Sequence, residues 1–167
     1  MKDRVRYTDI FGYERRNALL DAIHATDGTA SFDQLKQVVR KAEMKSIEKV
    51  GEDSEKKFLK YASHLDNIFF VQNAHPQEDV YKGVDMWIRF KKGEGLPDLP
   101  VQVKSSFKDV DAFRENSNYL KRKCLEIVIN CGPKVTEENF KIQFRGEIKR
   151  IKASITANPS LLNSIKR

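Results

Sequence analysis

Two neighbouring stretches of the chain carry an acid, an amide and an amine among hydrophobic residues. The first is GVDMWIRF (83–90), with Asp85, and the second is LPVQVKSS (99–106), with Gln102 and Lys104. Both stretches alternate apolar and polar residues, which is typical of β-strands. Residues two apart in a strand share a face, so Gln102 and Lys104 point the same way. If the two strands pair antiparallel, Asp85 meets both side chains on one face of the sheet.

These three side chains suit the binding of a hard cation and of a phosphate. Polar groups buried on a sheet face are costly unless they are paired or bound to a metal. The carboxylate of Asp85 and the amide oxygen of Gln102 are ligands that Mg²⁺ prefers. Lys104 could hold a water molecule and offset negative charge that develops on a phosphate. The alternative is a solvent-facing hairpin in which Asp85 and Lys104 form a cross-strand pair.

The order of these residues resembles the core of the PD-(D/E)xK nuclease superfamily. Asp85 is followed by a loop rich in glycine and proline, KKGEGLPDLP (91–100), and then by Gln102-Val103-Lys104, with sixteen residues between Asp85 and Gln102. Glutamine in place of the second acid is found in Mrr-like restriction endonucleases and in one family of homing endonucleases. The similar region covers about residues 50–131.

The resemblance implies a role for each matching position. Asp85 and Gln102 would bind Mg²⁺ or Mn²⁺ together with the backbone carbonyl of Val103, and Lys104 would be the catalytic lysine. The superfamily also has a glutamate on the helix before these strands. Glu55, in GEDSEKKFLKYAS, matches this position, and Glu52 is the competing choice.

The resemblance implies a metal-dependent DNA endonuclease, which often cuts two strands as a homodimer. The nominal proline before the first acid is replaced by Val84, and glutamine removes one negative charge from the metal site. Some superfamily members have lost catalysis. The second hypothesis is therefore a non-catalytic module on the same fold that binds nucleic acid or a protein.

The pattern of helices and strands predicts an α/β fold. Helical spacing predicts helices at 9–25, 31–44 and 53–65, with Gly51 breaking or bending the chain between the last two. Strands are predicted at 67–72, 83–90, 99–106 and 124–130, and 107–123 is expected to be helical in part. Thr136 is expected to cap a last long helix, although NFKIQF (139–144) also alternates like a strand.

This order of elements suggests three layers with a mixed central sheet flanked by helices. With the resemblance, we expect a restriction-endonuclease-like fold. The predicted domains are an N-terminal helical extension (1–45) and a nuclease core (46–167).

The net charge of +7 lies entirely in the second half of the chain. Residues 1–90 hold 15 Lys and Arg against 15 Asp and Glu, whereas residues 91–167 hold 16 against 9. A basic half suits a polyanion such as DNA, and a solvated basic surface is the alternative. The candidate nucleic-acid contacts are Lys91, Lys92, Ser105, Ser106, Lys121, Arg122, Lys141, Arg145 and Lys149.

The remaining features point to an ordinary protein of a reducing compartment. Cys124 and Cys131 flank a predicted strand, which would hold their α-carbons about 23 Å apart, too far for a disulfide. We expect reduced thiols. No apolar run approaches the roughly 20 residues of a membrane helix, and no secretory signal is evident, which predicts a cytoplasmic or nucleoid-associated protein without a membrane partner.

Overall fold

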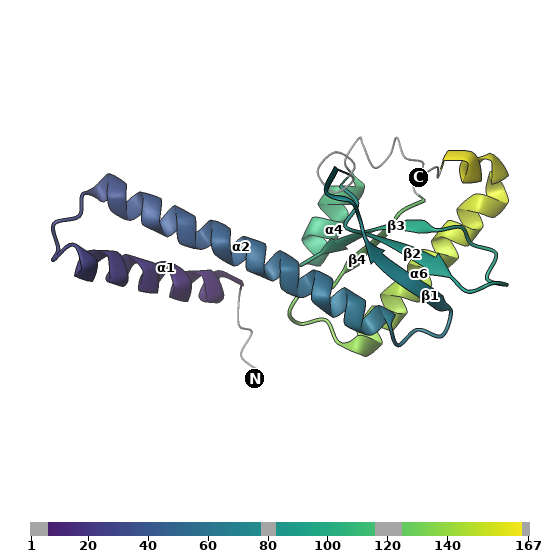
Figure 1. Ribbon diagram of the computed structural model, residues 1–167, viewed down its shortest axis with the longest axis horizontal. Coiled ribbons are helices and arrows are strands. Elements are labelled where there is room, and N and C mark those ends of the chain that lie inside the picture. Colours follow the sequence, from purple (N-terminus) through teal and green to yellow (C-terminus); the bar gives the residue numbers. More distant parts are fainter. Residues whose placement is uncertain (1–6, 78–82, 116–124, 165–167) are drawn as a thin grey trace. The chain divides into compact units, whose positions relative to one another are not determined.

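The computed structural model describes residues 7–77, 83–115 and 125–164. The described chain is α/β, with a four-stranded mixed sheet (Figure 1). Contacts divide it into two compact units, Met1–Val50 and Gly51–Arg167. The predicted domain boundary after residue 45 falls inside a helix. The elements are α1 (Tyr7–Ala25), α2 (Phe32–Ala62), β1 (Ile68–Asn73), β2 (Met86–Phe90), β3 (Leu99–Lys104), α4 (Phe107–Arg114), β4 (Ile127–Asn130), α6 (Glu137–Ala157) and the 3₁₀ helix η1 (Pro159–Ser164).

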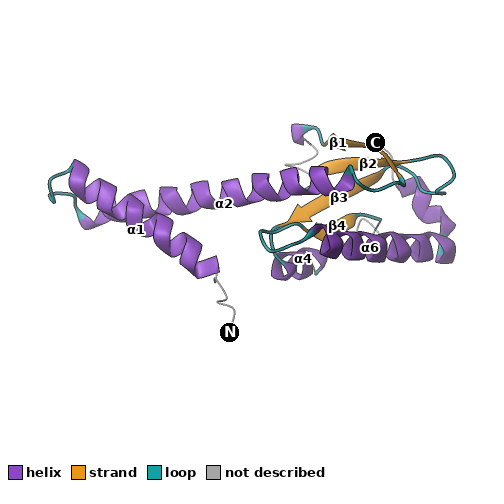
Figure 2. Cartoon of the chain, turned by 90° about the horizontal axis from the view of Figure 1, so that it is seen from below, coloured by secondary structure: helices purple, strands orange, loops and turns teal. Residues whose placement is uncertain are grey.

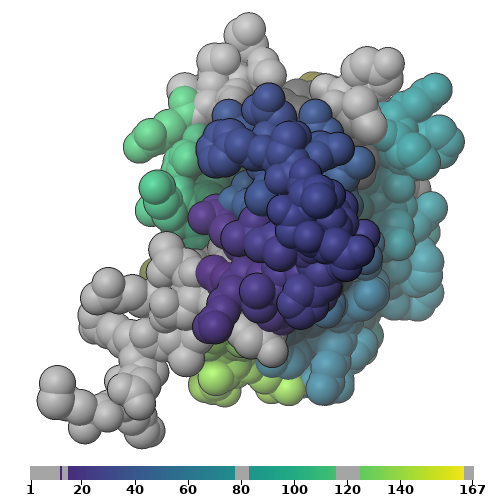
Figure 3. All heavy atoms as spheres, turned by 90° about the vertical axis from the view of Figure 1, so that its left-hand side faces the viewer, coloured from purple at the N-terminus to yellow at the C-terminus, as the bar shows by residue number. Residues whose placement is uncertain are grey.

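The first unit is a helical hairpin of α1 and the first part of α2, coloured purple to blue in Figure 3. A capping box begins α2. The Ser31 amide donates to Gln34 Oε1 at 2.8 Å, and the Gln34 amide donates to Ser31 Oγ at 3.4 Å. An ion pair between Arg15 and Glu43 joins the two helices. The N-terminal part is therefore helical, as predicted.

The predicted break at Gly51 is wrong, because α2 is one helix from Phe32 to Ala62. A glycine inside a helix costs about 1 kcal/mol relative to alanine but creates no clash. The turns that follow are held by packing, since Phe58 and Ala62 are fully buried against the sheet. Burial of these side chains therefore outweighs the local cost of the glycine.

The sheet has the strand order β1-β2-β3-β4. β1 pairs antiparallel with β2, and β2 pairs antiparallel with β3, which confirms the predicted hairpin. β4 pairs parallel with β3, in the register Val101↔Ile127 to Lys104↔Asn130. Figure 2 shows the strands in orange, side by side. The carboxyl ends of β3 and β4 therefore lie at the same end of the sheet.

Helices lie on both faces of this sheet. The main core joins one face to α2 and α6 and contains the aromatic cluster of Phe58, Phe140 and Phe144. On the opposite face, Val110 and Phe113 of α4 pack against Val128 of β4. The described part of the second unit thus has three layers, as the order of elements predicted.

The last long helix, α6, begins as the sequence predicted. Thr136 is its N-cap and accepts a hydrogen bond from the Asn139 amide at 3.2 Å. Val135 and Phe140, on either side of this cap, both belong to the main core. The alternative strand at 139–144 is wrong, because Phe140 and Phe144 lie one helical turn apart and both face the core.

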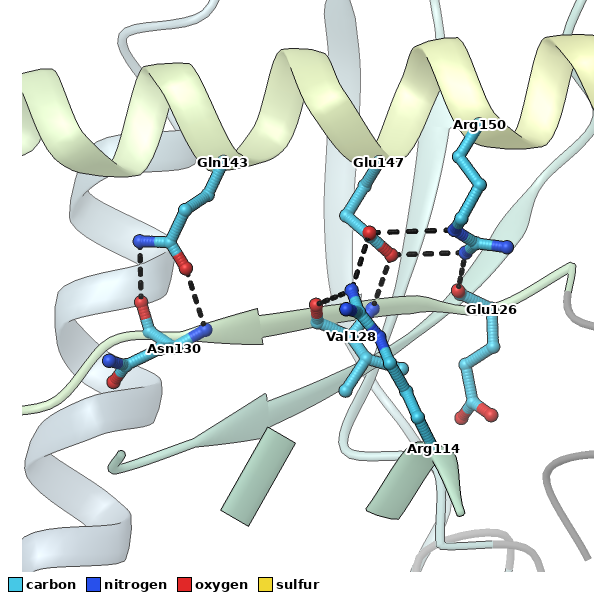
Figure 4. Close-up of polar contacts among 7 residues, drawn as sticks. All are labelled: Arg114, Glu126, Val128, Asn130, Gln143, Glu147 and Arg150. Atoms are coloured by element: carbon cyan, nitrogen blue, oxygen red, sulfur yellow. Dashed lines mark hydrogen bonds and ion pairs between the residues drawn. The ribbon is translucent and has the colours of Figure 1, made fainter. Parts of the chain in front are cut away.

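The outer edge of β4 is covered by side chains rather than by another strand (Figure 4). Gln143 of α6 accepts from the Asn130 amide at 3.2 Å and donates to its carbonyl at 3.4 Å. Glu147 accepts from the Val128 amide at 3.2 Å, and the Val128 carbonyl accepts from Arg114 at 3.4 Å. These side-chain hydrogen bonds replace the backbone hydrogen bonds that another strand would make. They explain how an edge strand can be buried at every position.

Two arginines neutralise the buried carboxylate at this edge. Arg114 Nη2 lies 2.6 Å from Glu147 Oε1, and Arg150 Nη2 lies 3.0 Å from Glu147 Oε2. Arg150 also donates to the Glu126 carbonyl at 2.7 Å. Because Arg114 is on α4 and Arg150 on α6, the cluster links helices from the two faces of the sheet.

Candidate functional site

The carboxylate of Asp85 lies against Gln102 and Val103. Gln102 Nε2 is 2.7 Å from each carboxylate oxygen, and the Val103 amide nitrogen is 2.6 Å from Oδ2. The hairpin pairing causes this meeting, because the Asp85 amide donates to the Val101 carbonyl at 2.9 Å. The structure therefore brings together the acid and the amide that the sequence analysis singled out.

Asp85 lies where β2 and β3 stop pairing. The paired register ends at Met86↔Val101, and beyond it the Asp85 carboxylate accepts the hydrogen bond from the Val103 amide. Backbone groups in a strand alternate sides. The Lys104 carbonyl accepts from Cys131 of the β4 side, so the Val103 carbonyl faces the β2 side, as Asp85 does. The backbone carbonyl of Val103 thus faces the same side of β3 as Asp85.

Gln102 is buried, with 5% of its surface exposed, and its Oε1 has no hydrogen-bond partner in the described residues. An unsatisfied buried acceptor costs about 1–3 kcal/mol. A half-turn of the amide exchanges its oxygen and nitrogen. This rotation would direct Gln102 Oε1 at the Asp85 carboxylate. Two oxygen acceptors can face each other favourably only with a cation or a proton between them. With the Val103 carbonyl, this set of hard oxygen donors fits Mg²⁺.

Lys104 occupies the same sheet face, two residues along β3. It is half-buried, and its Nζ lies 4.6 Å from the centroid of the Phe113 ring on α4. The sequence analysis did not include Phe113 among the site residues. Its helical spacing from Val110 marked it only as an apolar residue of α4, and no local pattern connects it to β3.

The two candidate glutamates lie on α2, and both Glu55 and Glu52 are exposed. On the same helix, Lys57 Nζ donates to the carbonyls of Gly132 at 2.8 Å and Pro133 at 3.1 Å. These two hydrogen bonds anchor the helical turn that contains Glu55 to the loop that follows β4. No group of three or more His, Cys, Asp or Glu side chains suited to a metal occurs among the described residues. The predicted side-chain ligands, Asp85, Glu55 and Gln102, do not form a group of this kind, because one of the three is an amide.

The predicted nucleic-acid contacts differ in their availability. Lys91 and Lys92 are exposed in the loop after β2, and Arg145 and Lys149 are exposed on α6. Lys141 forms an ion pair with Glu137 at 2.8 Å, and the adjacent carboxylate raises the pKa of Lys141. Lys121 and Arg122 lie outside the described residues.

The two serines after the QxK stretch serve α4 in this structure. Ser106 is the N-cap of α4, accepts from the Asp109 amide at 3.2 Å and donates to Asp109 Oδ2 at 2.6 Å. Ser105 donates to the same oxygen at 3.3 Å. The predicted phosphate contacts would require these hydroxyl groups to exchange Asp109 for phosphate.

A hollow of about 680 Å³ lies beside the candidate site. The Ala74 amide in its wall donates to the Asp85 carbonyl at 2.9 Å. Trp87, the sole tryptophan, is buried and lines the hollow. The lining residues are Gln72, Asn73, Ala74, His75, Pro76, Gln77 and Trp87.

Comparisons with known proteins give no relative. No family model matches the chain, and neither a curated protein nor a solved structure is significantly similar to it. Within the described residues, no helix has the length and apolar character needed to cross a membrane. The geometry of the site and the order of its elements are therefore the observations that bear on function.

Proposed function

We propose that this protein is a metal-dependent DNA endonuclease of the PD-(D/E)xK type. The observation that carries the proposal is the contact of Asp85 with Gln102 and Val103 at the point where β2 and β3 separate. These three residues are part of the ligand set that the resemblance implies, which also includes Glu55. They come from the two arms of one hairpin, in the predicted order.

The arrangement of elements supports a restriction-endonuclease-like fold. A helix with Glu55 precedes three antiparallel strands, and a crossover through α4 leads to the parallel strand β4. The proposed site lies at the carboxyl end of β3, beside the start of α4. Ligand sites in mixed and parallel sheets commonly lie at the carboxyl ends of strands.

The proposed reaction adds water across a phosphodiester bond. Mg²⁺ or Mn²⁺ bound to Asp85, Gln102 Oε1 and the Val103 carbonyl would supply Lewis-acid activation of the phosphate and of a water molecule. Lys104 contributes a positive charge that favours the negative charge developing on the phosphate oxygens. Glu55 is the candidate for an outer ligand or for a contact to water.

DNA is the proposed substrate because the basic excess lies in the half of the chain that follows the Asp85 strand. The exposed Arg145 and Lys149 would contact the phosphate backbone, with Lys91 and Lys92 on the loop after β2. A homodimer would supply two such sites for the two strands of a duplex.

The proposal is tested by incubating the protein with supercoiled and linear DNA in Mg²⁺ or Mn²⁺. We expect cleavage that is lost on chelation and reduced at least 100-fold by Asp85→Asn or Lys104→Ala. Lys108→Ala is the matched control, because Lys108 is exposed on α4. Cleavage that survives both site substitutions would exclude this site as the catalytic centre.

One observation favours the second candidate, a non-catalytic nucleic-acid-binding module. The Asp85 carboxylate already accepts hydrogen bonds from Gln102 and Val103 within the chain. Such a module would bind DNA in a salt-sensitive manner and would cleave nothing. Thermal stabilisation by Mn²⁺ that disappears in Asp85→Asn distinguishes the two functions, because only the nuclease requires the cation.

A further inference from the structure

The ammonium group of Lys104 lies over an aromatic ring from a different element. Its Nζ is 4.6 Å from the centroid of Phe113, within the roughly 6 Å at which a cation is attracted to a ring face. Lys104 ends β3, and Phe113 lies near the end of α4. A lysine side chain is a point charge on a flexible stem. A ring at this distance therefore limits where the charge can lie.

The Phe113 ring is itself held in place. It is half-buried and packs with Val110 and Val128 on the sheet face opposite the main core. The start of α4 is fixed by its Ser106 cap. Because Val128 belongs to β4, the ring is anchored by the sheet as well as by its own helix.

The same ring also lies near the backbone beside the candidate site. A side-chain carbon added to Gly83 would lie 3.9 Å from Phe113 Cε2 and 3.3 Å from Gln102 Oε1. Gly83 has a φ of +59°, which side chains rarely adopt, so the close approach here suits glycine. Gly83 therefore lies close both to the edge of the Phe113 ring and to the amide oxygen of Gln102 that has no hydrogen-bond partner among the described residues.

We propose that Phe113 is a positioning residue, which holds the ammonium group of Lys104 beside the Asp85–Gln102 pair. The proposal depends on the proposed function, because it assigns Phe113 to the lysine that would face the scissile phosphate. The negative face of the ring attracts the ammonium group, and the packed helix α4 fixes the ring. Phe113 itself touches no reacting atom in this role.

The contact between Lys104 and Phe113 can be measured by NMR without an assay of DNA cleavage. Protons above a ring face are shifted upfield in NMR spectra, so the ε-methylene protons of Lys104 should be displaced from the other lysine signals. Their loss in Lys104→Arg assigns them. We expect the displacement to vanish in Phe113→Leu and to persist in Phe113→Tyr. Phe107→Leu is the matched control, because Phe107 is 60% exposed on the same helix.

Cleavage kinetics supply the second measurement. Phe113→Leu should lower kcat roughly 2- to 30-fold and leave KM within about 2-fold, while Phe113→Tyr restores the wild-type rate. Far-UV circular dichroism and thermal unfolding show whether Phe113→Leu is folded. A wild-type rate in Phe113→Tyr would show that the aromatic ring matters, rather than only the volume of the side chain.

The two proposals fail in different ways. Wild-type protein that cleaves DNA with ordinary Lys104 proton shifts overturns the positioning role and leaves the nuclease. Displaced shifts in a protein that cleaves nothing overturn the nuclease, and the ring contact stands. Phe113→Leu with lost displacement and an unchanged kcat also overturns the positioning role.

Discussion

The amide nitrogen of Gln102 donates hydrogen bonds to both carboxylate oxygens of Asp85, at 2.7 Å each, while its amide oxygen has no partner among the described residues. The Gln102 amide therefore supplies hydrogen bonds to the Asp85 carboxylate in the absence of a cation. A cation between the two residues requires the opposite orientation of the amide. In the proposed nuclease, metal binding would therefore compete with these hydrogen bonds for the carboxylate of Asp85.

Gln102→Glu tests this competition. The substitution removes the Nε2 donor and places two carboxylates together, so we expect a metal-free protein that is about 1–3 kcal/mol less stable. It also restores a charged ligand, so Mn²⁺ should stabilise it more than the wild type. Thermal unfolding with and without Mn²⁺ measures both effects. Gln72→Glu, an exposed position on β1, is the control. A metal response that does not change in Gln102→Glu would contradict the prediction.

Glu147→Ala should be among the most destabilising substitutions in the chain. It leaves Arg114 and Arg150 without their shared carboxylate and exposes the Val128 amide at the sheet edge. Loss of one partner from a buried ion pair typically costs about 3–5 kcal/mol. Urea unfolding measures the free energy. Glu138→Ala, exposed on the same helix, should change it by less than about 0.5 kcal/mol. A loss for Glu147→Ala as small as that control would show that the edge is held by other contacts.

Cys131 should be chemically inert in the native protein. Burial raises the pKa of its thiol to about 12, although the nearby charge of Lys57 opposes this shift. At pH 8 only about one thiol in 10,000 is then ionised. A Cys124→Ser variant isolates Cys131, and the thiol should react with an aromatic disulfide reagent only on unfolding. Stoichiometric reaction of the folded variant within seconds would contradict the buried site.

Glu137 should make acid stability depend on its contacts with Lys141 in the same helix and with His64 in the turn after α2. Hydrogen bonds from Lys141 first, and from His64 second, hold the pKa of Glu137 below its usual value of 4.5. The contribution to stability is therefore present above pH 4.5 and is lost as the pH falls through the lower, folded-state pKa.

Acid unfolding of Glu137→Gln measures this term. The variant should lose stability relative to the wild type near neutral pH and converge with it in strong acid. Glu138→Gln is the control, because both residues lie in the first turn of α6 and share its helix dipole. Parallel acid-unfolding curves for Glu137→Gln and the wild type would show that the contacts contribute nothing.

Trp87 should report DNA binding directly. It is the sole tryptophan and lines the hollow beside Asp85. A nucleotide bound next to the site would change its environment, so we expect a change in tryptophan emission on titration with a short oligonucleotide. Salt should weaken the effect. Anisotropy of a labelled oligonucleotide provides the independent measure, and binding without any emission change would place the DNA away from this hollow.

The local features of this protein follow from the order of its residues. The hairpin loop and strand alternation fix the register that brings Asp85 to Gln102, because only sixteen residues separate them. Ser31 with Gln34, and Thr136 with Asn139, form caps that depend on residues three apart. Such contacts depend on chain geometry and hydrogen-bonding capacity, which the order of residues specifies.

Tertiary structure decided the features that depend on residues far apart in the chain. Gly51 predicts a weak point in α2, and burial of Phe58 and Ala62 against the sheet outweighs that local preference. Val128 lies in an apolar stretch typical of a central strand, yet β4 is at the edge of the sheet. There the carboxylate of Glu147 in α6 accepts the hydrogen bond from the Val128 amide. Packing also brings the Phe113 ring to Lys104. These outcomes follow from which surfaces exclude water together, and this depends on the whole fold.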